Sequence, residues 1–141
     1  MKQSEITFII TSVINFPKKK LSYSTVRSMY SPKEREQQTL QTINSIRKKV
    51  PGATIVLVEM GLKRNIDTAL INAADQFIYV GSNWLVKWSC NSMHKGLGEA
   101  MGLLIASSRI KTGAVLYFKI SGRYLLNNEF KLDACYPSHQ V

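Results

Sequence analysis

The chain has 141 residues, 45% of them hydrophobic and 20% charged, which suits one compact globular domain with an apolar core. A formal charge of +10 predicts an anionic partner, which could be a nucleic acid, a membrane surface or a phosphorylated small molecule. No apolar run reaches the roughly eighteen residues that a spanning helix needs, and the amino end has no cleavage site, so we expect a soluble, cytoplasmic protein without a transmembrane segment.

The first part of the chain predicts a strand, a long loop and a helix. Residues 6–14 (ITFIITSVI) are rich in β-branched side chains, which is typical of a buried strand. Residues 15–32 contain two prolines and a lysine run, which indicates a loop. Ser31 and Glu34 have the spacing of a capping box, and Pro32 between them suits the first helical position. A helix should therefore follow and end before Pro51-Gly52.

The middle of the chain continues the alternation. Residues 53–59 (ATIVLVE) form a continuous apolar run, which is typical of a strand buried on both faces. Ile66, Leu70, Ile71 and Ala74 have helical spacing, and residues 77–80 (FIYV) predict a short third strand. Strand, helix and strand in this order indicate right-handed crossovers between parallel strands.

The last part predicts an irregular segment, a helix and a strand. Residues 81–94 show no clear period, and we expect Trp84 and Trp88 within them to pack under a loop or in the core. A helix should open at Gly96-Leu97-Gly98, with Leu97, Met101, Leu104 and Ser108 repeating at helical spacing. Residues 114–120 (AVLYFKI) predict a fourth strand.

The order of elements predicts the fold class and the place of a site. We expect one α/β domain over residues 1–141, with an open, mostly parallel sheet and helices on both faces, as in Rossmann-like folds. Ligands of such sheets bind beyond the carboxyl ends of the strands. The polar residues that the pattern brings to that edge, together with a lysine at a helix start, are Thr11, Ser12, Glu59, Lys95, Lys119, Ser121 and Arg123.

The order and spacing of several segments resemble a known family. "ITFIITSVI", "QQTLQTINSI", "PGATIVLVEMG" and "KGLGEAMGLLIASSRIKTGAVLYFKISGRYLL" resemble the nucleotide-sugar-binding half of glycosyltransferases with the GT-A fold, over nearly the whole chain. That family shows a strand ending "VDDGS", a "KGxxxA" segment and a strand ending in a DxD motif. Here Glu59 keeps one acid of the first motif, and Lys95-Gly96 with Ala100 matches the second.

The resemblance implies a donor site with altered chemistry. The DxD acids of the family hold a divalent metal at the sugar donor's diphosphate, but Lys119 and Ser121 stand at their place here. We therefore predict metal-independent binding of a nucleotide-diphosphate sugar, with Lys95, Lys119 and Arg123 facing phosphate and Thr11, Ser12 and Glu59 facing the nucleoside. No cofactor is predicted, although a divalent metal stays open. The cysteines, Cys90 and Cys135, lack CxxC spacing and predict neither zinc nor a disulfide.

Each assignment has a structural alternative. Lys119 could simply alternate outward from a half-buried strand, and Arg123 could pair with Glu129 or Asp133. Glu59 could cap a loop at the strand end. The glycines beside Lys95 could serve only a tight turn into the helix.

The activity is left open by the sequence. An inverting sugar transfer needs a general base, which in the resembling enzymes lies in an acceptor-binding half beyond the DxD strand. This chain ends soon after that point, and only Glu129 and Asp133 remain as acids. It could be a short glycosyltransferase, a donor-binding module lacking the acceptor half, or an inactive relative, with the acceptor unknown. The alternative is a basic α/β protein without catalysis that binds nucleic acid or docks an acidic partner.

Overall fold

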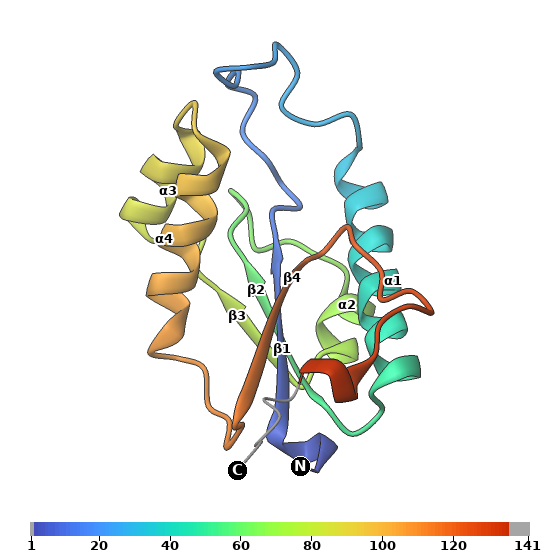
Figure 1. Cartoon of the computed structure of the whole chain (residues 1–141). Coiled ribbons are helices and arrows are strands. Elements are labelled where there is room, and N and C mark those ends of the chain that lie inside the picture. Colours follow the sequence, from blue (N-terminus) through green and yellow to red (C-terminus); the bar gives the residue numbers. More distant parts are fainter. Residues whose placement is uncertain (1, 136–141) are drawn as a thin grey trace.

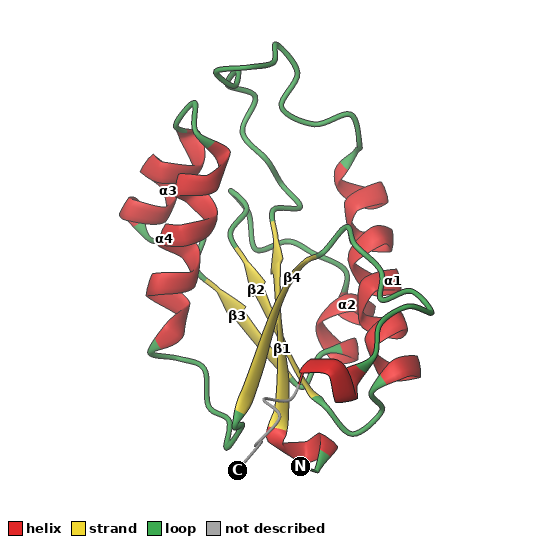
Figure 2. Ribbon diagram, in the orientation of Figure 1, coloured by secondary structure: helices red, strands yellow, loops and turns green. Residues whose placement is uncertain are grey.

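The computed structural model describes residues 2–135 and shows an open sheet of four parallel strands (Figures 1 and 2). The strands are β1 (Ile6–Ser12), β2 (Thr54–Glu59), β3 (Gln76–Tyr79) and β4 (Leu116–Ser121). Their order in the sheet is β3-β2-β1-β4, and every pairing is parallel. This order matches the first four strands of the doubly wound dinucleotide-binding sheet, so the predicted Rossmann-like α/β class is confirmed.

Helices cover both faces of the sheet, as expected. The helices α1 (Pro32–Lys49) and α2 (Thr68–Ala73) lie on one face, and α3 (Trp84–Asn91) and α4 (Lys95–Ser107) lie on the other (Figure 1). Two short 3-10 turns, η1 (Gln3–Glu5) and η2 (Leu132–Cys135), flank the ends of the described chain. Crossovers therefore pass on one side from β1 to β3 and on the other side from β3 to β4.

The first core lies between the sheet and the α1/α2 layer. The alternation of side chains along a strand sends Ile6, Phe8 and Ile10 of β1 to this face, where they meet Ile43 and Ile46 of α1. From the edge strand, Phe118 stacks on the Phe8 ring with centroids 5.0 Å apart. Large aliphatic and aromatic side chains thus fill this side of the sheet.

The second core lies under α3 and α4 and uses smaller side chains. Val56, Val58 and Met60 project from β2 and its end, and Ala106 and Cys90 meet them from the helices. Glycines let α4 approach closely. A Cβ on Gly102 would stand 2.0 Å from the Met60 sulfur, and one on Gly98 would stand 2.9 Å from the Cys90 sulfur.

The start of α1 follows the capping box expected from the sequence. The Ser31 hydroxyl accepts a hydrogen bond from the Glu34 N–H at 3.2 Å, and the Glu34 carboxylate accepts one from the Ser31 N–H at 2.7 Å. Both bonds satisfy N–H groups that a helix start leaves without partners. Hydrogen bonds from the backbone and then from the side chain of Ser31 to the Glu34 carboxylate lower the pKa of Glu34.

Two expectations for the α3/α4 layer were wrong. Residues 84–91, expected to be irregular, form α3, because the Asn83 side chain accepts hydrogen bonds from the N–H groups of Leu85 and Val86. Trp84 and Trp88 on this helix are 72% and 61% exposed rather than packed in the core. The small residues Val86, Ser89 and Cys90 form the buried face instead.

The buried face of α4 also differs from the expected one. Gly98, Gly102 and Ala106 face inward, whereas Leu97 and Leu104 are exposed. The reason is geometric, since the close approach of Cys90 to position 98 and of Met60 to position 102 leaves no room for a Cβ there. Met101, one of the expected residues, does pack against the second core.

The remaining features agree with the sequence in outline. Residues 13–31 form the expected long loop, which Figure 1 shows beyond the carboxyl ends of the strands. Cys90 is buried and Cys135 is exposed, and both are free thiols. Over residues 2–135, no helix is both long enough and apolar enough to cross a membrane.

Candidate functional site

The ends of β1 and β4 meet at the point where the direction of the crossovers changes. Thr11 lies opposite Ser121 in the sheet register, and the Gly122 N–H donates a 2.9 Å hydrogen bond to the Thr11 carbonyl. β1 is followed by a crossover toward β2 on one side, whereas β4 arrives from the other side. Loops diverge at such a switch point, which is where open α/β sheets place their ligands.

A cavity of about 410 Å³ lies at this switch point. Its walls come from the ends of β1 and β4, the loop after β1, the first turns of α1 and the first turn of α4. Six of the seven predicted site residues line it, and they are Thr11, Ser12, Lys95, Lys119, Ser121 and Arg123. The tertiary structure adds further charged lining residues, which are Arg27, Arg35 and Glu99.

Glu59 is the predicted residue that does not line the cavity. Its side chain is fully buried, and its carboxylate accepts hydrogen bonds from the Ser12 hydroxyl, from the Ile14 N–H at 2.9 Å and from the Gly61 N–H at 2.8 Å. It therefore joins the ends of β1 and β2 as a loop cap, which is the structural alternative considered for it. Burial raises the pKa of Glu59 to about 7, against the opposing effect of its hydrogen bonds and of Arg35.

Arg35 forms part of the wall that α1 contributes. It is only 7% exposed, and its guanidinium donates hydrogen bonds to the Val13 carbonyl at 2.7 Å and to the Ser28 hydroxyl at 3.0 Å. The same group lies 4.9 Å from the centre of the Phe16 ring. Burial, followed by the positive charge of Arg123, lowers the pKa of Arg35 to about 10. The group still carries its full charge at neutral pH.

Arg27 fastens the long loop over the cavity. Its guanidinium donates to the carbonyls of Lys19 at 2.8 Å, Cys90 at 2.6 Å and Ser92 at 2.6 Å. Cys90 and Ser92 belong to the end of α3 and its connection to α4, so the bonds join the loop to the opposite helix layer. This contact places a further cation in the cavity wall.

The pKa of Lys95 reflects the nearby cations of the cavity wall. Burial lowers its pKa, and the positive charges of Arg123, Arg35 and Arg27 lower it further, while Glu99 opposes them. Like charges that disfavour one another in this way would be stabilised by an anion between them. The cavity is thus electrostatically suited to an anionic ligand.

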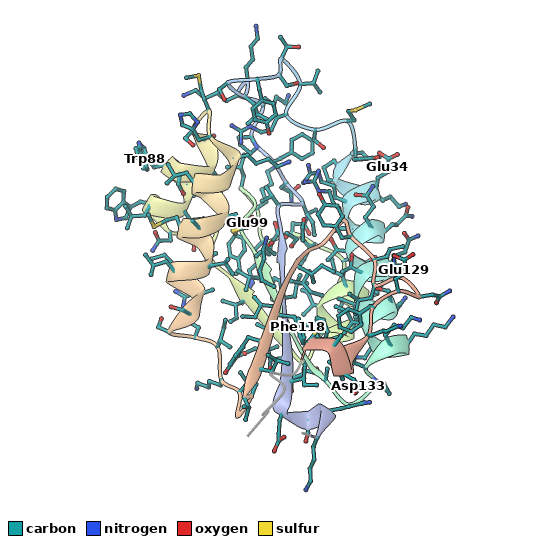
Figure 3. The ribbon with its side chains drawn as sticks, in the orientation of Figure 1. Glu34, Trp88, Glu99, Phe118, Glu129 and Asp133 are labelled. Atoms are coloured by element: carbon teal, nitrogen blue, oxygen red, sulfur yellow. The ribbon has the colours of Figure 1, made fainter. Side chains whose placement is uncertain are left out.

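Glu99 is the acid of the cavity wall, and it holds Lys119. The Glu99 carboxylate accepts a 2.6 Å hydrogen bond from the Thr11 hydroxyl and forms a 2.5 Å ion pair with the Lys119 ammonium. Burial raises the pKa of Glu99, but the hydrogen bonds from Lys119 and Thr11 outweigh it and the pKa is lowered overall. Figure 3 shows Glu99 on the side of α4 that faces the sheet.

The alternatives considered for the two strand-end cations resolve differently. Lys119 does project from a half-buried strand, yet toward Glu99 and the cavity. Arg123 also lines the cavity, and among residues 2–135 the ion pairs are Arg47 with Asp75 and Lys119 with Glu99. Glu129 and Asp133, the partners considered for Arg123, are labelled in Figure 3, and within residues 2–135 neither forms an ion pair with it.

Arg27, Arg35 and Glu99 were missed by the sequence reasoning. Arg35 and Thr39 precede Ile43 at steps of four, so extending the buried face of α1 toward its start would have found Arg35. Glu99 lies four residues after Lys95, on the same face of the helix. Arg27 sits in a loop without periodicity, and no local signal places it.

Comparison with known proteins returned no match, whether with protein-family models, with curated proteins or with solved structures. Fold and cavity therefore define the chain as a Rossmann-like α/β protein with a cationic pocket at the switch point. In residues 2–135, no three side chains of His, Cys, Asp or Glu gather so as to hold a metal ion.

Proposed function

We propose that this pocket binds a nucleotide-diphosphate sugar and that the chain is a glycosyltransferase or a donor-binding module of one. The observation that carries the proposal is the convergence of Arg27, Arg35, Lys95 and Arg123 on one cavity beyond the strand ends. The resemblance of the segment order to GT-A glycosyltransferases supports the sugar-nucleotide part of the proposal.

The charge balance of the cavity favours a multiply charged ligand. Lys119 is matched by Glu99, since the two form a close ion pair. None of the other lining cations forms an ion pair within residues 2–135, where the ion pairs are Arg47 with Asp75 and Lys119 with Glu99. A diphosphate carries enough negative charge to compensate several such cations, and arginine offers paired donors to phosphate oxygens.

The start of α4 adds neutral donors to the same wall. Its first residues, Lys95 and Gly96, line the cavity, and the N-cap residue His94 makes no side-chain cap hydrogen bond. The first N–H groups of a helix attract anions, and a glycine allows close approach of a ligand. Phosphate oxygens at this turn would accept hydrogen bonds from the first N–H groups of α4, which have no side-chain cap.

In this proposal the protein's own cations take the role of the family's metal. Lys119 and Ser121 end β4 where the resembling enzymes have DxD, and Arg123 follows in the next turn. We propose that Glu99 neutralises Lys119 while no phosphate is bound, because its carboxylate is engaged by Lys119 and Thr11. A chelator tests whether binding is independent of a metal.

Isothermal titration calorimetry with uridine and guanosine diphosphates, with and without a chelator, tests the proposal. We expect binding that is unchanged by the chelator. A ligand at about a hundredfold its Kd stabilises the folded state by about 2.7 kcal/mol, so a thermal-shift panel of sugar nucleotides should raise Tm by several degrees. Loss of binding with the chelator would reject the metal-independent site.

One variant and one matched control sharpen the experiment. Arg123→Ala should weaken diphosphate binding by about tenfold or more, because it removes a cation that lines the cavity. Lys131→Ala, which removes an equal charge from an exposed position outside the cavity, serves as the control. Equal weakening in both variants, or no heat with any nucleotide in the wild type, would contradict a specific pocket.

A further inference from the structure

The loop after β1 carries an unusual charge distribution. Between Glu5 and Glu34 the chain has no acidic residue. The same stretch contains Lys18, Lys19 and Lys20, all exposed, as well as Arg27 and Lys33. Figure 1 shows this loop as the end of the molecule, beyond the strand ends and beside the connection between α3 and α4. One end of the protein is therefore strongly positive.

The same loop exposes apolar side chains beside the lysines. Met29 is 91% exposed, and Tyr23 and Val26 are also largely exposed. Met93, in the connection between α3 and α4, is exposed too, and its carbonyl accepts a 3.1 Å hydrogen bond from the Ser22 N–H. We call this combination the loop surface, and its residues are Lys18, Lys19, Lys20, Tyr23, Val26, Met29 and Met93.

The loop surface is fastened to the fold from both sides. Arg27 bonds to carbonyls at the end of α3, and Arg35 of α1 bonds to the Ser28 hydroxyl. These contacts hold the segment in place, so its exposed apolar side chains stay at the surface and outside both cores. Exposed apolar groups rimmed by polar residues mark sites of interaction with another surface.

We propose that the loop surface docks on an anionic lipid membrane. Lysines at a protein surface are attracted by the negative potential of acidic headgroups, and apolar side chains among them enter the interfacial layer. Methionine and valine gain from contact with hydrocarbon, whereas a polynucleotide would offer them little. Tyrosine suits the boundary between headgroups and acyl chains. A membrane matches both halves of this surface.

Docking in this way would bring the lipid surface close to the cavity. Tyr23 and Arg27 belong to the loop and also line the cavity. A second substrate reaching the pocket from a membrane would thus meet the ligand site directly. The docking proposal stands apart from nucleotide binding, because the lysines and Met29 do not line the cavity.

Sedimentation with vesicles tests the docking without any nucleotide. The full chain is mixed with vesicles of phosphatidylcholine alone, or of phosphatidylcholine with about a quarter phosphatidylserine, at about 0.1 M salt. We expect the chain to sediment with the anionic vesicles and to stay in solution with the neutral ones. Absence of binding to the anionic vesicles would overturn the proposal, whatever the nucleotide titration shows.

Matched variants separate the effect of the loop lysines from the effect of net charge. A triple Lys18→Ser, Lys19→Ser, Lys20→Ser variant should lose about two orders of magnitude in vesicle affinity, since each lysine near an anionic membrane contributes about fivefold. Triple substitution of Lys48, Lys111 and Lys131 by serine removes the same charge from exposed positions outside the loop. An equal loss in that control would overturn the proposal.

A third variant addresses the apolar half. Met29→Ser should weaken vesicle binding severalfold at unchanged charge, because it removes the most exposed apolar side chain of the loop. A competing polynucleotide provides the last arm. If Met29→Ser has no effect and the polynucleotide displaces the vesicles completely, the surface is a nucleic-acid site and the membrane proposal fails.

Discussion

The two faces of the sheet present different kinds of side chain. Toward α1 and α2 the strands present large side chains such as Ile6, Phe8 and Leu57, all buried. On the other face, which α3 and α4 cover, the strands β1 and β4 present Thr7, Thr11, Lys119 and Ser121. Glycines of α4 pack closely on this side. The first face supplies apolar burial, whereas the second brings backbone and polar groups close together at the pocket.

The acids beneath and beside the pocket show the same contrast. Glu59 points to the α1 side, where burial raises its pKa to about 7. Glu99 reaches the sheet from α4, where Lys119 and Thr11 lower its pKa. The same type of side chain thus has opposite pKa shifts on opposite faces. Glu59 is fully buried and the cost of burial outweighs its hydrogen bonds, whereas Glu99 is only partly buried and has the Lys119 ammonium as a direct partner.

The largest effect should come from a cavity in the α1 face. Ile46 is fully buried on α1, so Ile46→Ala should lower the free energy of unfolding by about 2–5 kcal/mol. Urea denaturation measures the change, with the more conservative Ile46→Val expected to cost about 0.5–1.5 kcal/mol. The control Leu104→Ala, on the exposed side of α4, should change stability by less than about 0.5 kcal/mol. Equal costs at both positions would contradict the contrast between the faces.

The next effect concerns Glu59 and pH. Its pKa in the folded state, about 7, lies above the ordinary 4.5, so the folded chain holds the extra proton between these values. Stability from this group is therefore full below the lower pKa and is lost as pH rises through the upper one. The total change is about 3 kcal/mol.

The variant Glu59→Gln removes this titration while keeping an oxygen acceptor for the neighbouring N–H groups. Urea denaturation at about pH 5 and pH 8 should show the variant gaining stability relative to the wild type at the higher pH. A difference that stays constant across this range would show that Glu59 does not titrate there.

A smaller effect should follow from crowding the α3/α4 face. In Gly98→Ala the new Cβ would stand 2.9 Å from the Cys90 sulfur and 3.1 Å from its Cα, so the helices must separate slightly. We expect a net cost of about 1–2 kcal/mol, because strain exceeds the helical preference of alanine. Gly96→Ala meets nothing within 4 Å and should be neutral or stabilising in the same thermal denaturation. A stabilised Gly98→Ala would show that the layer is not tightly packed.

The smallest effect is expected for Glu99→Gln in the pocket. The substitution releases Lys119 from its ion pair, so the affinity for a nucleoside diphosphate should rise by up to about fivefold. Calorimetric titration measures the change, and Glu129→Gln removes the same charge at an exposed position outside the cavity. A lower affinity would mean that Glu99 itself contacts the ligand.

Much of the architecture followed from local patterns. Burial on both faces made β2 recognisable as an apolar run, and the Ser31-Glu34 capping box located the start of α1. Parallel strands gather their carboxyl ends at one edge and helix starts point to the same edge. The sequence therefore predicted one location for the six residues that line the cavity, which are Thr11, Ser12, Lys95, Lys119, Ser121 and Arg123. The single-domain, donor and cofactor predictions remain predictions.

By itself, then, the sequence determined the alternation of strands and helices, because hydrophobic period and caps are local properties of the chain. Only the tertiary structure decided that the tryptophans of α3 are exposed, since the close approach of α4 depends on contacts distant in sequence. It also decided that Glu59 turns inward while Arg27, Arg35 and Glu99 complete the pocket. Side-chain direction at a strand end and the path of a long loop depend on which partners the packed layers bring within reach.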